Sequence, residues 1–113
     1  MTSDCLFCRI IAKEIPAKIV AETKHCVAFR DINPQAPTHI LVIPREHIAS
    51  LDSATDATIL GRMQLLAAEL ARKEGITERG YRTVINTNAD AGQTVFHIHL
   101  HLLGGRRMGW PPG

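Results

Sequence analysis

The stretch TVFHIHLHLL, residues 94–103, constrains the fold most strongly, because its histidines alternate with apolar residues. Alternation with period two predicts a β-strand whose two faces differ in chemistry. The apolar face is expected to pack under a helix and comprises Thr94, Phe96, Ile98, Leu100 and Leu102. The opposite face is expected to present the imidazoles and comprises Val95, His97, His99, His101 and Leu103.

The order of expected helices and strands in the rest of the chain predicts an α+β domain with an antiparallel sheet and helices on one side of that sheet. Strands are expected at residues 18–23, 25–32, 38–44 and 81–87, where β-branched residues gather between turn-forming residues. A short helix is expected within 3–16, capped by Ser3 or Asp4. One long helix is expected over 50–75, capped by Ser53 or Asp56 and ended by Gly75. A core-facing stripe at helical spacing supports it and comprises Ile59, Met63, Leu66 and Leu70.

A chain of 113 residues predicts a single domain, 1–113, with a Gly- and Pro-rich tail at 104–113. The net charge is +2 and the basic residues are scattered, which argues against a nucleic-acid partner. We find no apolar run that could span a bilayer and no signal peptide, so neither a membrane partner nor export is expected. The expected location is the cytoplasm.

Three cysteines do not complete a set of disulfides. Cys5 and Cys8 form a C-x-x-C pattern, which in a reducing compartment favours a metal site or a redox pair. The C-x-x-C pattern alone does not distinguish a metal site from a redox pair. Cys26, within an apolar strand, is interpreted as a small buried hydrophobic residue.

Two chemistries suit three histidines in one row. An H-x-H pair on a strand can supply two ligands to one zinc ion. The outer pair, His97 and His101, lies roughly 13–14 Å apart along an extended strand, so all three do not easily reach one ion. Alternatively, imidazole titrates near neutral pH and can attack phosphorus, so the row could provide a nucleophile and a proton-handling group.

The His-x-His-x-His-x-x pattern resembles the signature of the histidine-triad (HIT) superfamily. CVAFRDINPQAPTHILVIPREHI, GYRTVINTNADAGQTVFHIHLHLLGG and WPPG are similar to the Hint branch of purine nucleoside phosphoramidases. This resemblance covers nearly the whole chain. It implies a five-stranded antiparallel sheet with two helices, and a homodimer with a continuous ten-stranded sheet. It also implies hydrolysis of the P–N bond of nucleoside 5′-phosphoramidates, AMP or GMP joined to an amine, through a covalent nucleotidyl-histidine.

The resemblance also implies roles for single residues. His99, the middle histidine, would be the nucleophile, and His101 would hydrogen-bond a phosphate oxygen or the leaving group. His39 would lie near the triad and orient it. The other nucleotide-binding residues would be Phe29, Asp31, Ile32, Asn86, Gly92, Gln93, Thr94 and Trp110. Asp31 would hold the ribose hydroxyls, while Gln93 and Thr94 would bind the α-phosphate. Simpler interpretations remain for three of them: core packing for Phe29, a turn for Asn86, and packing on its own surface for Trp110.

Relatives that keep the C-x-x-C resemble a zinc-bearing subset, and galactose-1-phosphate uridylyltransferase is a more distant relative with a comparable site. That resemblance implies a structural Zn²⁺ held by Cys5, Cys8, His47 and His97. His47 serves the active site in relatives without zinc, so its role stays open here. His97 would then face the metal, while His99 and His101 face the nucleotide.

Three further hypotheses stay open at this point. The same histidine chemistry suits a dinucleoside polyphosphate hydrolase, although the WPPG tail argues against it. A zinc-stabilised nucleotide-binding or scaffold protein with little turnover is another possibility. The third hypothesis is a zinc hydrolase in which His97 and His99 both bind the catalytic zinc ion.

Overall fold

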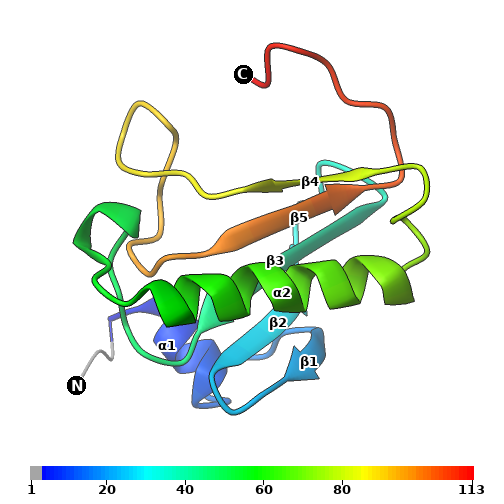
Figure 1. Ribbon diagram of the computed structural model, residues 1–113. Coiled ribbons are helices and arrows are strands. Elements are labelled where there is room, and N and C mark those ends of the chain that lie inside the picture. The colour runs from blue at the N-terminus through cyan, green and yellow to red at the C-terminus, as the bar shows by residue number, and fades with distance from the viewer. Residues whose placement is uncertain (1–3) are drawn as a thin grey trace.

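The computed structural model describes residues 4–113, which form one antiparallel five-stranded sheet in the order β1-β2-β3-β5-β4 (Figure 1). The strands are β1 (Ile19–Glu22), β2 (Cys26–Arg30), β3 (Thr38–Pro44), β4 (Tyr81–Val84) and β5 (Leu100–Gly104). The helices are α1 (Leu6–Ile11), α2 (Ala57–Lys73) and the 3-10 helix η1 (Leu51–Ser53). The expected fold class, a five-stranded antiparallel α+β sheet with two α-helices, is confirmed.

Helix α2 covers one face of the sheet (Figure 1). Its predicted apolar stripe is buried and packs against strand residues of a single face: Ala28, Ile40, Val42, Leu100 and Leu102. Asp56 caps the helix by accepting the N–H of Thr58, and Gly75 follows its end with φ 73°. The single helix expected over 50–75 is therefore wrong at its start, because Ser53 belongs to η1 and a break separates it from α2. No helix in the described part of the chain is both long and apolar enough to cross a bilayer.

Helix α1 lies on the opposite face of the sheet, which corrects the expectation that the helices share one side. Its buried residues, Phe7 and Ile10, pack against the alternate strand residues Val27, Phe29, Leu41 and Ile43. The cap was also predicted wrongly, because the Cys5 sulfur accepts the N–H of Cys8 and occupies the N-cap position. Asp4 precedes the cap, and Ser3 lies outside the described residues.

The histidine stretch is only half a strand. Strand β5 begins at Leu100, and residues 94–99 approach it as a bent segment outside the ladder. Phe96 is accordingly half exposed instead of lying under α2. The alternation nevertheless holds from residue 97 onwards, because Ile98, Leu100 and Leu102 enter the α2 core. The imidazoles of His97 and His99 are thus directed to the α1 face, where both pack against Phe7.

Candidate functional site

The His99 ring is buried and held in one orientation. Its Nδ1 lies 2.8 Å from the carbonyl oxygen of His97. Because a carbonyl oxygen can only accept a hydrogen bond, the neutral ring carries its proton on Nδ1, and its Nε2 has the lone pair. The rings of Phe7 and His101 both meet the His99 ring edge to face, with centroids 5.0 Å away. A fixed imidazole with one free lone pair has the form that a nucleophile requires.

A chain of hydrogen bonds assigns the tautomer of His101 in the same way. The backbone N–H of Gln35 donates to Nδ1 of His39 at 3.0 Å, so neutral His39 carries its proton on Nε2. That Nε2–H donates to Nδ1 of His101 at 2.9 Å. His101 is left with a donor N–H at Nε2, beside the His99 ring. The site therefore places a lone pair on His99 next to a hydrogen-bond donor on His101.

Burial makes the neutral forms of His39 and His101 the stable ones. Desolvation is the largest cause that lowers the pKa of His101, to about 4, with further lowering by His99 and His39. Burial also lowers the pKa of His39, although Asp31, whose Oδ2 lies 3.5 Å from Nε2 of His39, acts in the opposite direction. Both side chains are therefore neutral near pH 7, as the tautomer assignment requires.

Four side chains predicted as metal ligands converge on one point. The ligand atoms of Cys5, Cys8, His47 and His97 all lie within 4.8 Å of one another. Nδ1 of His97 is 3.4 and 3.5 Å from the sulfurs of Cys5 and Cys8, and Nδ1 of His47 is 3.4 Å from the sulfur of Cys8. A tetrahedral ion with usual Zn–S and Zn–N bonds separates sulfur from nitrogen by about 3.5 Å, so the donor set fits zinc.

The orientation of His97 supports the same conclusion. Nε2 lies 2.8 Å from the Pro44 carbonyl oxygen, which places the proton on Nε2 and turns the Nδ1 lone pair toward the cysteines. A metal-binding histidine commonly donates its other N–H to a carbonyl in this way. Burial lowers the pKa of His97, which also favours the neutral form that a ligand must have.

The loop before the histidines is organised by Gln93. Its buried side chain accepts the N–H of Asn88 at 2.9 Å and donates to the carbonyls of Ala49 and Val95 at 2.8 and 3.2 Å. These bonds tie the loop to the segment after β3. Thr94, in contrast, is exposed, and Gly92 has φ 86°, which suits glycine.

The remaining predicted nucleotide-binding residues lie in different environments. Phe29 is part of the core under α1 with 4% exposure, as the simpler interpretation has it. Asp31 is half-buried and accepts the N–H of Asn33 through Oδ1 at 2.7 Å. Ile32 is fully exposed and Trp110 is 83% exposed, so neither side chain is buried in the fold. Asn86 follows β4 and is half-buried.

Sequence reasoning missed three groups that orient the histidines. Phe7 packs on His97 and His99. The sequence carried a signal for this role, because Phe7 lies between Cys5 and Cys8. A metal that bound both cysteines would also fix the position of the Phe7 ring. The Pro44 carbonyl and the Gln35 N–H act through the backbone, so no side-chain pattern marks them.

An oriented imidazole beside an imidazole donor, carried on a five-stranded antiparallel sheet with a third histidine turned to a cluster of two cysteines and a histidine, is the arrangement of a histidine-triad protein. Residues 12–108 match the HIT domain, and the chain belongs to the HIT domain family.

Known proteins agree along nearly the full length. The purine nucleoside phosphoramidase of Escherichia coli (strain K12) is 51% identical over 111 residues, covering 96% of this chain and 93% of that protein. An uncharacterized HIT-like protein of Synechococcus elongatus is 56% identical and matches over the whole of both chains. A HIT family hydrolase from Legionella pneumophila superimposes with a TM-score of 0.94 and 55% identity, covering 96% of this chain and 99% of that structure.

Proposed function

We propose that this protein is a hydrolase that cleaves the P–N bond of purine nucleoside 5′-phosphoramidates, conjugates of AMP or GMP with an amine. The observation that carries the proposal is the 2.8 Å hydrogen bond from Nδ1–H of His99 to the His97 carbonyl, which leaves Nε2 available for attack on phosphorus. The phosphoramidase relative from Escherichia coli supports the choice of bond and of purine nucleotide.

In the first step, the Nε2 lone pair of His99 forms a bond to the α-phosphorus while the P–N bond to the amine breaks. The proton that stays on Nδ1 leaves a positive charge on the phosphorylated ring, and the His97 carbonyl stabilises that charge. The departing nitrogen takes up a proton from solvent and leaves as the neutral amine, while the Nε2–H of His101 donates a hydrogen bond to it or to a phosphate oxygen. Water then attacks phosphorus and returns one proton to solvent as the bond to His99 breaks, which releases the nucleoside monophosphate and regenerates neutral His99.

Other residues would bind the nucleotide. Asp31 would accept the ribose hydroxyl protons, since a carboxylate accepts well from both. The exposed Thr94 hydroxyl and the backbone after Gly92 would bind the α-phosphate, while Gln93 holds this loop in place through its internal bonds. Ile32 and Asn86 would complete the nucleotide site, and Phe29 would support it from the core.

The metal in the cluster of Cys5, Cys8, His47 and His97 would be a structural zinc ion. Four protein ligands and a tetrahedral donor set leave no open position, which is typical of a structural site. Bound zinc would supply a cross-link between α1, the segment after β3, and the histidine stretch. The pair Cys5 and Cys8 would then be reduced thiolates, which is consistent with a cytoplasmic location.

The chain would act as a single domain, 1–113, in a homodimer. Within residues 4–113, strand β4 lies at an edge of the sheet beside β5, and its four residues are half-buried (Figure 1). Pairing of this edge with a second copy would give the continuous ten-stranded sheet. Trp110, 83% exposed on the tail, would then reach the partner's nucleotide.

The test is turnover of adenosine 5′-phosphoramidate by the His99→Ala variant, with His25→Ala as a matched control outside the site. We expect the first variant to lose essentially all activity and the second to keep it. Wild-type turnover by His99→Ala would overturn the assignment. Preferred cleavage of a dinucleoside polyphosphate would favour the dinucleoside polyphosphate hydrolase. AMP binding without turnover by the wild type would favour the nucleotide-binding or scaffold protein.

A further inference from the structure

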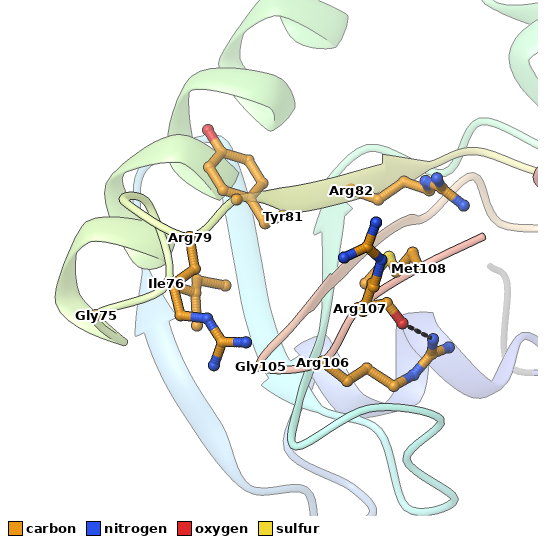
Figure 2. Close-up of a pocket in the computed structure, with 10 residues that line it drawn as sticks. Gly75, Ile76, Arg79, Tyr81, Arg82, Gly105, Arg106, Arg107 and Met108 are labelled. Carbon is orange, nitrogen blue, oxygen red and sulfur yellow. Dashed lines mark hydrogen bonds between the residues drawn. The ribbon is translucent and has the colours of Figure 1, made fainter. Parts of the chain in front are cut away.

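An arginine-lined cavity of about 510 Å³ lies where the end of α2, the start of β4 and the segment after β5 meet. Four of its lining residues are arginines, Arg79, Arg82, Arg106 and Arg107, and none is acidic. Figure 2 shows Arg79 on one side of the cavity and the other three on the opposite side. The cavity therefore gathers positive charge from two separate segments, 79–82 and 106–107, of a chain whose net charge is only +2.

No acidic side chain among the described residues forms an ion pair with these arginines. Arg82 donates to the Gly109 carbonyl at 2.9 Å, and Arg106 donates to the carbonyls of Gln35 and Arg107 at 2.9 and 3.1 Å. Such bonds to neutral carbonyls orient the guanidinium groups and leave their charge in place, which is a favourable setting for an anion.

The backbone turn at Gly105 builds one wall of the cavity. Gly105 has φ 90°, and a Cβ at this position would lie 2.9 Å from the Pro37 Cβ. Only glycine suits this turn, which brings Arg106 and Arg107 back beside Arg79 and Arg82. The arrangement of the arginines thus depends on a specific backbone conformation and not on four mobile side chains alone.

We propose that this cavity binds a short linear polyphosphate, either free or as the phosphate chain of a nucleotide, at a site separate from the histidines. Guanidinium groups bind phosphate oxygens in pairs, and several phosphates in a row suit arginines on opposite walls. The volume is within the range of small-ligand sites, about 300–1,000 Å³. A single phosphate would contact fewer of the four arginines, so a chain of phosphates is the better match.

The experiment is calorimetric titration of the intact protein with inorganic tripolyphosphate at low salt, in the presence of saturating AMP to occupy the proposed catalytic site. We compare the wild type with Arg79→Gln/Arg107→Gln, which removes two exposed arginines that make no side-chain hydrogen bond within the described residues. The matched control is Arg62→Gln/Arg72→Gln, which removes the same charge from the exposed side of α2.

We expect one tripolyphosphate per wild-type chain, a loss of affinity of about tenfold or more in Arg79→Gln/Arg107→Gln, and less than about a twofold change in the control. The proposal would be overturned if the wild type did not bind tripolyphosphate, if both double variants lost the same affinity, or if AMP displaced tripolyphosphate completely. If Arg79→Gln/Arg107→Gln changes the melting temperature or the oligomeric state, two single variants replace the double ones. The tripolyphosphate affinity of Arg107→Gln is then compared with that of Arg62→Gln as its control. Tighter binding of a nucleoside triphosphate than of tripolyphosphate identifies the nucleotide as the ligand, and the reverse order identifies free polyphosphate.

Discussion

The carbonyl oxygen of His97 accepts the Nδ1–H of His99 at 2.8 Å, while the imidazole of His97 lies within the cysteine–histidine cluster. One residue therefore serves both sites, through its side chain at the cluster and through its backbone at the proposed nucleophile. A change that releases the His97 side chain also frees the carbonyl that orients His99. The cluster and the His99 ring are accordingly expected to respond together to such a change.

Replacement of the two cysteines, which removes half of the proposed metal ligands, tests this relationship. We expect Cys5→Ser/Cys8→Ser to lose its metal and about 3 kcal/mol or more of stability, which lowers the melting temperature by roughly 10 °C or more. Because His99 loses its fixed orientation, kcat is expected to fall more than KM rises. Metal analysis, calorimetry and steady-state kinetics with adenosine 5′-phosphoramidate measure these three changes.

The control for this variant is Cys26→Ala, which changes a buried cysteine outside the cluster and should keep the metal. If the double variant still bound one zinc ion per chain, the metal would have to lie elsewhere. The carboxylate and imidazoles of Asp31, His39 and His101 also lie within 4.8 Å of one another and would be the alternative position.

His39 is expected to act as a positioning residue through His101. In His39→Ala, nothing donates to Nδ1 of His101, so its tautomer is no longer defined, and kcat should fall about tenfold. In His39→Gln, the side-chain amide nitrogen can replace Nε2 as the donor, and most of the activity should return. Equal kcat values for the alanine and glutamine variants would show that the donor to His101 does not matter.

Spacing predicted the sheet, and the family resemblance predicted that Cys5, Cys8, His47 and His97 come together, as they do. Sequence patterns failed on the position of α1, although the signal was present in β2 and β3. Residues 26–29 and 38–44 are buried throughout, and the sequences CVAF (26–29) and ILVIP (40–44) within them are uninterrupted apolar runs, which are typical of strands covered on both faces. The expectation of helices on one side did not use this information.

The start of β5 and the roles of Gln35 and Pro44 could not be predicted in the same way. Residues 94–97 alternate as a strand does, yet the side chain of Gln93 bonds to the Val95 carbonyl and holds the chain outside the ladder. Backbone partners such as the Pro44 carbonyl arise from tertiary contacts between distant segments, and no residue type is required to make them.

Gln93 should matter more for stability than its exposed neighbour. Gln93→Ala leaves the Asn88 N–H and the Ala49 carbonyl without their partner, and we expect a loss of about 1–3 kcal/mol in the free energy of unfolding. Thr94→Ala is the matched control and should change stability by less than about 0.5 kcal/mol, because its side chain is exposed. Denaturant unfolding measures both, and a reversed order would contradict the structural role of Gln93.

Acid should destabilise the fold before the carboxylates titrate. In the unfolded chain His101 binds its proton near pKa 6.5, whereas burial holds the pKa at about 4 in the folded protein. Between these values the unfolded state binds more protons, so the contribution of His101 to stability is complete above pH 6.5 and is lost as the pH falls toward 4. At about 1.4 kcal/mol per unit, this contribution is at most about 3 kcal/mol. Unfolding measured from pH 7.5 to 4 should show a shallower decline in His101→Gln, and parallel curves for the two proteins would mean that other groups cause the acid sensitivity.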